Sequence, residues 1–228
     1  MKRTLVSWCS VVLIAVSSSA YADWFLSSDT KALIVKAEAG DVDAQFRVGA
    51  AYDLGKGAPR DVSESIKWYR MAAEAGNAEA QNSLGSVLQA EKKYTAALAW
   101  YEKASNQSHA LATNSLAYLY DLGLGVPQDR QRAFEFYARA ADLGWAQAMW
   151  NIANMYGAGQ LGPPDLLLAC VWSGRSQRYA GANERQLLAY LARAIPQVDR
   201  MLSADQLASC KEQVASWSPA ALAKSGQR

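Results

Sequence analysis

The sequence predicts an all-α protein, an α-solenoid of about four antiparallel helix-pair repeats with a helical cap at each end. Four segments that begin at Ala44, Ala80, Ala112 and Ala148 carry an aliphatic residue at position +4, Gly or Ala at +5, and an aromatic residue or Leu at +8. These offsets place the shared residues on one face of a helix. The segments start 36, 32 and 36 residues apart, a spacing typical of helical repeat arrays.

Residues 1–22 are predicted to form a signal peptide. Lys2 and Arg3 precede a mostly apolar run, and Ala20-Tyr21-Ala22 has the small residues of a cleavage site. The apolar run is too short to span a bilayer, so we expect cleavage near Ala22 and a periplasmic or secreted product. The alternative, a lipidated Cys9, is disfavoured because most of the apolar run follows this cysteine.

The repeats are expected to lie between two caps. Residues 23–40 should form an N-terminal capping helix, from Thr30 to Ala39, with Ser28 as its capping residue. Residues 181–228 should form a C-terminal helical cap and a polar tail, with helices at about 184–195 and 204–217 separated by Pro196. The four repeats themselves are expected at residues 41–76, 77–108, 109–144 and 145–180.

A second helix is predicted in each repeat, because an aromatic residue follows each first helix. These residues are Trp68, Trp100, Phe136 and Trp172, and we expect the three tryptophans to be core residues. The loop between the two helices has glycines, a proline and then an aspartate. Glycine suits the C-terminal end of one helix and aspartate the N-terminal end of the next. Repeat two lacks four residues, and we place this deletion in its loop.

The combined motif resembles the Sel-one-like repeat, a relative of the tetratricopeptide repeat. It consists of Gly-x-Gly-x-Pro-x-Asp, Trp or Phe followed by Tyr, Ala-Ala-x-x-Gly and Ala-x-x-x-Leu-Gly. The resemblance covers about residues 37–180 and is closest in repeats one and three. Repeat two departs by its short loop, and repeat four lacks the Tyr after Trp172. The resemblance implies a right-handed superhelix of antiparallel helix pairs.

The resemblance also implies a binding face for a protein or peptide on the concave side of the first helices. Asn side chains offer donors and acceptors to a peptide backbone, and aromatic side chains offer anchor area. The alternative is that these positions are merely solvated. Carried over from positions two and six after the repeat alanine, the expected binding residues are Phe46, Asn82, Asn114, Tyr118, Trp150 and Asn154.

Charge and cysteine content narrow the partners further. Without Lys2 and Arg3 the mature chain has 21 basic and 21 acidic residues, so we expect no nucleic-acid partner. No apolar stretch after residue 22 is long enough to span a membrane. Cys170 and Cys210 are the two remaining cysteines, and export favours a disulfide between them, with free thiols as the alternative.

The sequence offers little for catalysis. The single histidine, His109, is expected to be an exposed residue at a helix start, and it lacks further ligands for a metal site. Ser28 and Lys31 form the Ser-x-x-Lys pattern of penicillin-recognising enzymes, and Lys224-Ser225-Gly226 loosely resembles their third motif, but Ser-Asp-Asn is absent. We therefore predict a non-catalytic scaffold of the bacterial envelope without a cofactor. The alternative is a weak β-lactam hydrolase.

Overall fold

The structure is a computed structural model that describes residues 25–220, a range with eleven α-helices and no strand. The predicted signal peptide with Cys9, and the segment Lys224-Ser225-Gly226, lie outside the described residues. None of the helices in this range is both long and apolar enough to cross a membrane. The helices are α2 (Ser28–Glu38), α3 (Val42–Leu54), α4 (Val62–Glu74), α5 (Ala78–Ala90), α6 (Tyr94–Asn106), α7 (Ala110–Leu122), α8 (Arg130–Asp142), α9 (Ala146–Gly157), α10 (Leu166–Tyr179), α11 (Arg185–Asp199) and α12 (Ala204–Ser216).

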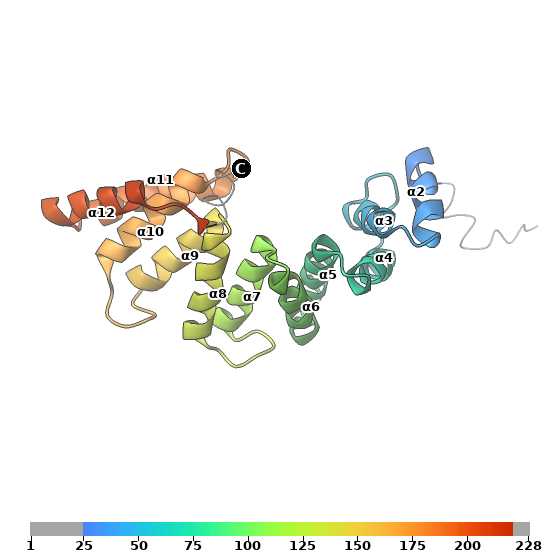
Figure 1. The fold of residues 1–228 in the computed structure, drawn as a ribbon, viewed down its shortest axis with the longest axis horizontal. Helices are drawn as coiled ribbons and strands as arrows, with labels where there is room; N and C mark the ends of the chain where they lie inside the picture. The colour runs from blue at the N-terminus through green and yellow to red at the C-terminus, as the bar shows by residue number, and fades with distance from the viewer. Residues whose placement is uncertain (1–24, 221–228) are drawn as a thin grey trace, which may run out of the picture.

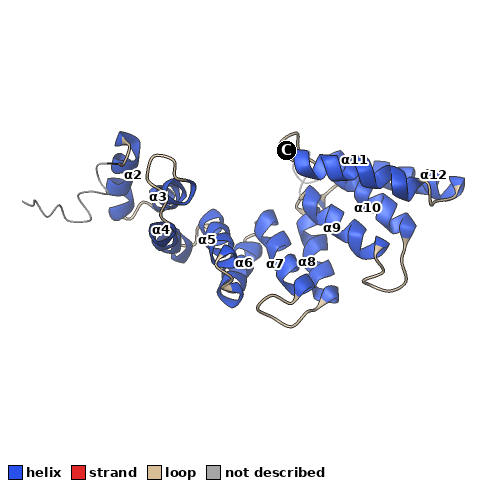
Figure 2. Cartoon of the chain, turned by 180° about the vertical axis from the view of Figure 1, so that it is seen from behind, coloured by secondary structure: helices blue, strands red, loops and turns tan. Residues whose placement is uncertain are grey.

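The helices form four consecutive pairs, α3 with α4, α5 with α6, α7 with α8 and α9 with α10, and each pair packs on the next. The pairs follow one another along an arch, with α2 at one end and α11 and α12 at the other (Figure 1, and from behind in Figure 2). In the first two pairs, α3 and α5 lie nearer the hollow of the arch than α4 and α6 (Figure 1). This arrangement confirms the predicted all-α solenoid of helix pairs with helical caps.

Local side-chain chemistry explains where the first helices begin and end. The side chains of Asp41, Asn77 and His109 each accept a hydrogen bond from the backbone N–H of the repeat alanine, at 2.9, 2.8 and 3.2 Å. Each therefore satisfies one of the free donors at a helix start. Gly55 and Gly123 end α3 and α7 with φ angles of 66° and 68°, in the left-handed region that glycine enters without strain.

Two predicted boundaries are wrong. The capping residue of α2 is Ser27, whose Oγ accepts the Thr30 N–H at 3.1 Å, whereas Ser28 is already helical. The second wrong boundary is the end of α11, which was expected before Pro196 but continues through it to Asp199. Pro196 and Ala192, the residue whose carbonyl loses its helical partner, are both exposed, so this carbonyl is not left buried without a partner.

Tyrosine rings of the second helices pack against small residues of the first helices. A Cβ atom at Gly49 would lie 2.6 Å from Cδ1 of Tyr69, and one at Gly85 would lie 2.7 Å from Cε1 of Tyr101. Both tyrosines are buried, with 3% and 2% of their surface exposed. The glycines at +5 therefore allow the two helices of a pair to approach until the ring fills the space between them.

The predicted tryptophan core holds fully for one of three residues. Trp68 is 6% exposed, whereas Trp100 and Trp172 are half-buried against the core. Lys103 lies 4.0 Å from the ring centre of Trp100, and Arg175 lies 4.6 Å from that of Trp172. A cation that must stay hydrated stacks on a ring whose outer face reaches water. These two rings are therefore only partly covered by the core, and a cation packs on each of them.

The long loops of repeats one and three each contact the start of an earlier helix, α2 for repeat one and α6 for repeat three. The carbonyl of Gly57 accepts the N–H of Ser27 at 2.8 Å, just before α2. The carbonyl of Gly125 accepts the Thr95 hydroxyl at 3.3 Å, in the first turn of α6. The α5–α6 loop is the one that lacks four residues, and its shortness leaves the start of α6 open to this contact.

The C-terminal cap is attached to the last repeat along α10. A disulfide joins Cys170 of α10 to Cys210 of α12, with the two Cα atoms 6.1 Å apart. Arg178 donates from Nη1 to the carbonyls of Val214 and Ala215, both at 2.8 Å. These two bonds satisfy carbonyls at the end of α12 that have no partner within the helix. Covalent and polar contacts therefore hold α12 on the same helix.

Candidate protein-binding face

Each first helix has one line of exposed or half-exposed residues, which we name the inner stripe. The second helices and the neighbouring pairs pack on the other sides of the first helices, and from this packing we infer that the line faces the hollow of the arch. The inner stripe comprises positions −1, +3, +6 and +10 relative to the repeat alanine. Its residues are Asp43, Arg47, Ala50 and Leu54 on α3; Glu79, Ser83, Ser86 and Ala90 on α5; Leu111, Ser115, Tyr118 and Leu122 on α7; and Gln147, Asn151 and Asn154 on α9, with Ala158 directly after it.

Three of the four large apolar side chains of the inner stripe lie on α7, in the middle of the arch, and the fourth is Leu54 on α3. Leu111, Tyr118 and Leu122 are 37%, 41% and 49% exposed. The inner stripe on α5 consists of mostly small and polar side chains, and the inner stripe on α9 carries three amide side chains. Large apolar side chains gathered on one exposed face, rather than scattered, mark a site of interaction.

The six predicted binding residues divide into two groups. Tyr118 and Asn154, at +6, are exposed on the inner stripe. The four residues at +2 are not: Asn82 is only 8% exposed, and the Phe46 ring lies 5.8 Å from that of Tyr69. Positions +2 and +6 are four residues apart and therefore only about 40° apart around the helix. The two groups lie on adjoining parts of one face, and +2 is the part that meets packed neighbours.

Asn114 and Trp150, the other two residues at +2, contact the next first helix along the chain. Asn114 Oδ1 accepts a hydrogen bond from Asn151 of α9 at 3.1 Å. Trp150 packs with Leu187 and Leu191 of α11. A helix of the C-terminal cap therefore covers part of the fourth repeat, whereas Asn154 of the same repeat stays exposed.

Three amides that the prediction missed or placed differently form a hydrogen-bonded chain from α9 to α7. Gln147 Nε2 donates to Asn151 Oδ1 at 3.1 Å, and Asn151 Nδ2 donates to Asn114 Oδ1 at 3.1 Å. Gln147 and Asn151 are four residues apart and thus share a helix face. That spacing is the signal in the sequence that could have identified them.

Buried tyrosine hydroxyls lie beneath the inner stripe. The Tyr101 hydroxyl donates to Gln89 Oε1 at 2.9 Å. Burial raises the pKa of Tyr69 and of Tyr101 to about 12, and the nearby carboxylate of Asp53 adds to the rise for Tyr69. Burial likewise raises the pKa of Tyr137. The three hydroxyls are therefore uncharged at neutral pH and place polar but neutral groups inside the helix pairs.

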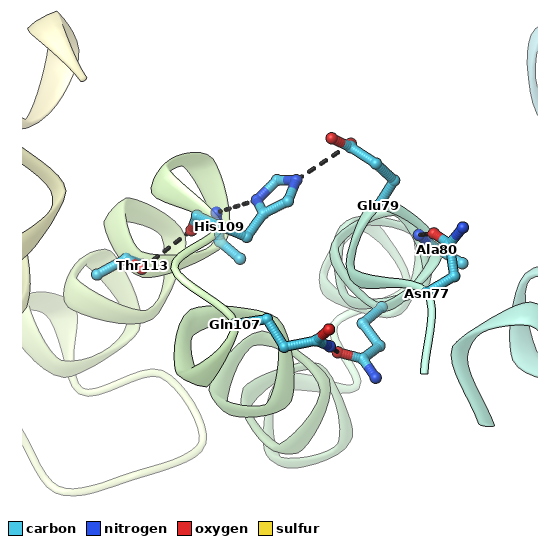
Figure 3. A network of polar contacts seen from close by, with 8 residues as sticks. Asn77, Glu79, Ala80, Gln107, His109 and Thr113 are labelled. Carbon is cyan, nitrogen blue, oxygen red and sulfur yellow. Dashed lines mark hydrogen bonds and ion pairs between the residues drawn. The ribbon is translucent and has the colours of Figure 1, made fainter. Parts of the chain in front are cut away.

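His109 is not the exposed residue that the sequence predicts, since only 13% of its side chain is exposed. Its Nδ1 caps α7, while its Nε2 lies 3.1 Å from Oε2 of Glu79 at the start of α5. Gln107 Nε2 donates to Gln81 Oε1 at 2.8 Å beside this pair. Figure 3 shows the resulting network between the starts of two consecutive first helices. His109 therefore helps to hold the repeats together.

The Ser-x-x-Lys pattern of Ser28 and Lys31 lies on the protein surface. Ser28 and Lys31 are both exposed on α2, and no hydrogen bond joins them in residues 25–220. Within the same range, no group of three or more His, Cys, Asp or Glu side chains is arranged to hold a metal ion.

Known protein families and structures match the chain over the same four repeats. A family model described as Sel1 repeat matches residues 42–77, 78–109, 110–145 and 146–175. The crystal structure of c5321, a protective antigen of uropathogenic Escherichia coli strains displaying an SLR fold, is similar with a TM-score of 0.74 and 24% identity, over 87% of this chain and 43% of that chain. A Sel1 repeat protein from Oxalobacter formigenes gives a TM-score of 0.61 and 26% identity, over 85% of this chain and 76% of that one.

A curated mouse protein, DAP3-binding cell death enhancer 1, is 35% identical over 69 residues. The match covers 30% of this chain and 14% of the mouse protein. This chain therefore spans less than half of the E. coli chain and a small part of the mouse protein.

Proposed function

This chain belongs to the Sel1 repeat family, and on that premise we propose that it is a non-catalytic scaffold of the bacterial envelope that holds a protein or peptide in the hollow of its arch. Repeats of this family generally mediate protein–protein interaction. The observation that carries the proposal is the apolar part of the inner stripe on α7, exposed in the middle of an otherwise well-packed array.

The size of the exposed apolar area limits the affinity that this face can provide by hydrophobic contact alone. Burying a fully exposed Leu or aromatic side chain contributes about 1.5–3 kcal/mol. Leu111, Tyr118 and Leu122 are each less than half exposed, so together they supply about 2–4 kcal/mol. That corresponds to millimolar affinity at best. A useful partner must therefore also use the hydroxyl and amide groups on either side of α7.

Site-specific photocrosslinking in cells tests the proposed face. A photoreactive residue at position 122, on the inner stripe, should capture a discrete partner, and adding Tyr118→Ala should weaken that capture. Position 71 is the matched control, because Met71 is 38% exposed on α4, a second helix away from the hollow. Equal capture from positions 122 and 71 would show that the hollow is not the binding face.

The envelope location and the absence of catalysis are tested separately. Fractionation should place the mature chain outside the cytoplasm with Cys170 and Cys210 protected from alkylation until a reductant is added. The purified mature chain should not turn over nitrocefin, and turnover that is lost on Lys31→Ala would support the β-lactam hydrolase alternative instead.

A further inference from the structure

A cavity of about 460 Å³ opens at one end of the α7 stripe, where the starts of α7, α9 and α11 meet. We name it the donor cavity. Leu111 belongs both to its wall and to the inner stripe, so the cavity and the exposed apolar surface are continuous. Its wall combines apolar side chains with hydrogen-bond donors, chiefly Leu111, Asn114, Trp145, Gln147, Arg185 and Leu187.

The amide chain that reaches the donor cavity has a direction. Gln147 donates to Asn151, and Asn151 donates to Asn114, each at 3.1 Å. The carbonyl of Asn114 is thus occupied, and its Nδ2 group has no acceptor among residues 25–220. Successive hydrogen bonds polarise one another, which makes the last N–H group of such a chain a better donor. The chain therefore presents a donor to the cavity.

Two more donors at the cavity are unmatched. The Nε1 atom of Trp145 is buried and has no acceptor in the described part of the chain. The Arg185 side chain is exposed and takes part in none of the ion pairs or hydrogen bonds of that part. Glu184, the acid at the cavity, is already engaged, since its Oε2 accepts the Gly181 N–H at 2.7 Å. Side-chain oxygens of Asn183 and Gln186 also line the cavity, but its one buried side-chain atom without a partner in residues 25–220 is the Trp145 donor. Beside that donor, the guanidinium fork of Arg185 matches a carboxylate.

Resting on the proposed function, we propose that the arch recognises a segment of another protein in which an acidic side chain neighbours apolar ones. The carboxylate binds in the donor cavity near Arg185 and Asn114, and the apolar side chains cover Tyr118 and Leu122 on α7. The distance from Leu111 to Leu122 along α7 is about 16 Å, from the rise of an α-helix. An extended chain covers that distance in about five residues, so the acid and the apolar anchors fall within one short segment.

A display library of random peptides tests this inference. The random segment is flanked by constant residues on both sides, so that every carboxylate in it belongs to a side chain. Selection on the mature chain should enrich Asp or Glu within about five residues of large apolar residues. For selected peptides, Arg185→Glu should weaken binding by about ten- to a hundredfold, the range expected for a charged hydrogen bond. Replacing the acid with its amide should cause the same loss.

The matched control is Arg193→Glu, the same charge change on an exposed position of α11 outside the cavity wall. It should leave binding within about a factor of two, as for a screened surface charge. An equal loss with Arg193→Glu, or selected peptides without acids, would overturn the acidic recognition.

A double variant, Tyr118→Ala with Leu122→Ala, separates this inference from the proposed function. If it abolishes binding while Arg185→Glu has no effect, the inner stripe remains the binding face and the carboxylate site is wrong. If neither set of changes alters binding, both proposals fail. Unchanged circular dichroism of every variant confirms that exposed side chains, and not folding, are being tested.

Discussion

Replacing Cys170 and Cys210 together with alanine should destabilise the C-terminal cap and leave the first repeats almost unaffected. The disulfide joins residues that are 40 apart in the sequence. In the chain-entropy description, a cross-link over such a loop contributes about 4 kcal/mol by restricting the unfolded chain. Each unit of a solenoid contacts only its neighbours, so the loss should fall on α10, α11 and α12.

Other contacts keep the cap folded after the bridge is removed. Arg178 still holds the end of α12, and the Tyr179 hydroxyl still donates to the carbonyl of Trp217 at 3.2 Å. The Trp217 ring also remains 5.8 Å from that of Trp172. The cap should therefore open more often without being unfolded at rest. A loss of about 4 kcal/mol corresponds to an opening equilibrium up to about a thousandfold higher.

Hydrogen–deuterium exchange with mass spectrometry measures this opening segment by segment. Amides of α11 and α12 should exchange much faster in the double variant, and amides of α3 to α6 should exchange as before. The oxidised wild-type chain treated with a reductant is the control and should behave in the same way. Faster exchange along the whole chain would show that the array unfolds as one unit and would refute the reasoning, as would unchanged exchange in α12.

Three further predictions concern stability. Gly85→Ala should lower the melting temperature followed by circular dichroism, because overpacking against Tyr101 costs about 1–3 kcal/mol and exceeds the gain of about 1 kcal/mol from replacing a helical glycine; a higher melting temperature would contradict this packing. Because the folded-state pKa of Tyr69 and of Tyr101 is about 12, above the ordinary value of 10, their contribution to the free energy of unfolding is complete below pH 10 and is lost as the pH rises from 10 to 12. Urea unfolding across that range should show the decline, and a flat profile would argue against buried hydroxyls. His109→Ala should cost about 1 kcal/mol of stability through loss of the α7 cap, and His109→Asn should restore most of it; equal melting temperatures for both variants would assign the effect to the Glu79 contact.

The repeat architecture could be predicted because its packing is encoded at short range. The repeat alanine, the small residue at +5 and the aromatic residue of the second helix recur at nearly constant spacing. Asp41 and Asn77 cap the helices that follow them directly. Each of these contacts joins residues of one helix or one pair, so a single sequence is enough to infer it.

The exposure of the predicted site residues was harder to infer because it depends on how consecutive pairs are rotated. Asn82 and Ser86 are only about 40° apart around α5, yet Asn82 is buried and Ser86 is exposed. The partner of His109 is Glu79, one repeat earlier, and the bond between Asn151 and Asn114 also crosses repeats. The sequence contains these residues but not the angle between pairs that brings them together.

The loop of repeat three depends on the short loop of repeat two. The Gly125 carbonyl reaches back to Thr95 at the start of α6, and a loop of full length after α5 would compete with it for that place. An insertion in repeat two should therefore disturb repeat three as well. Repeat four follows repeat three with a loop of full length of its own, so this dependence belongs to repeats two and three and not to the whole array.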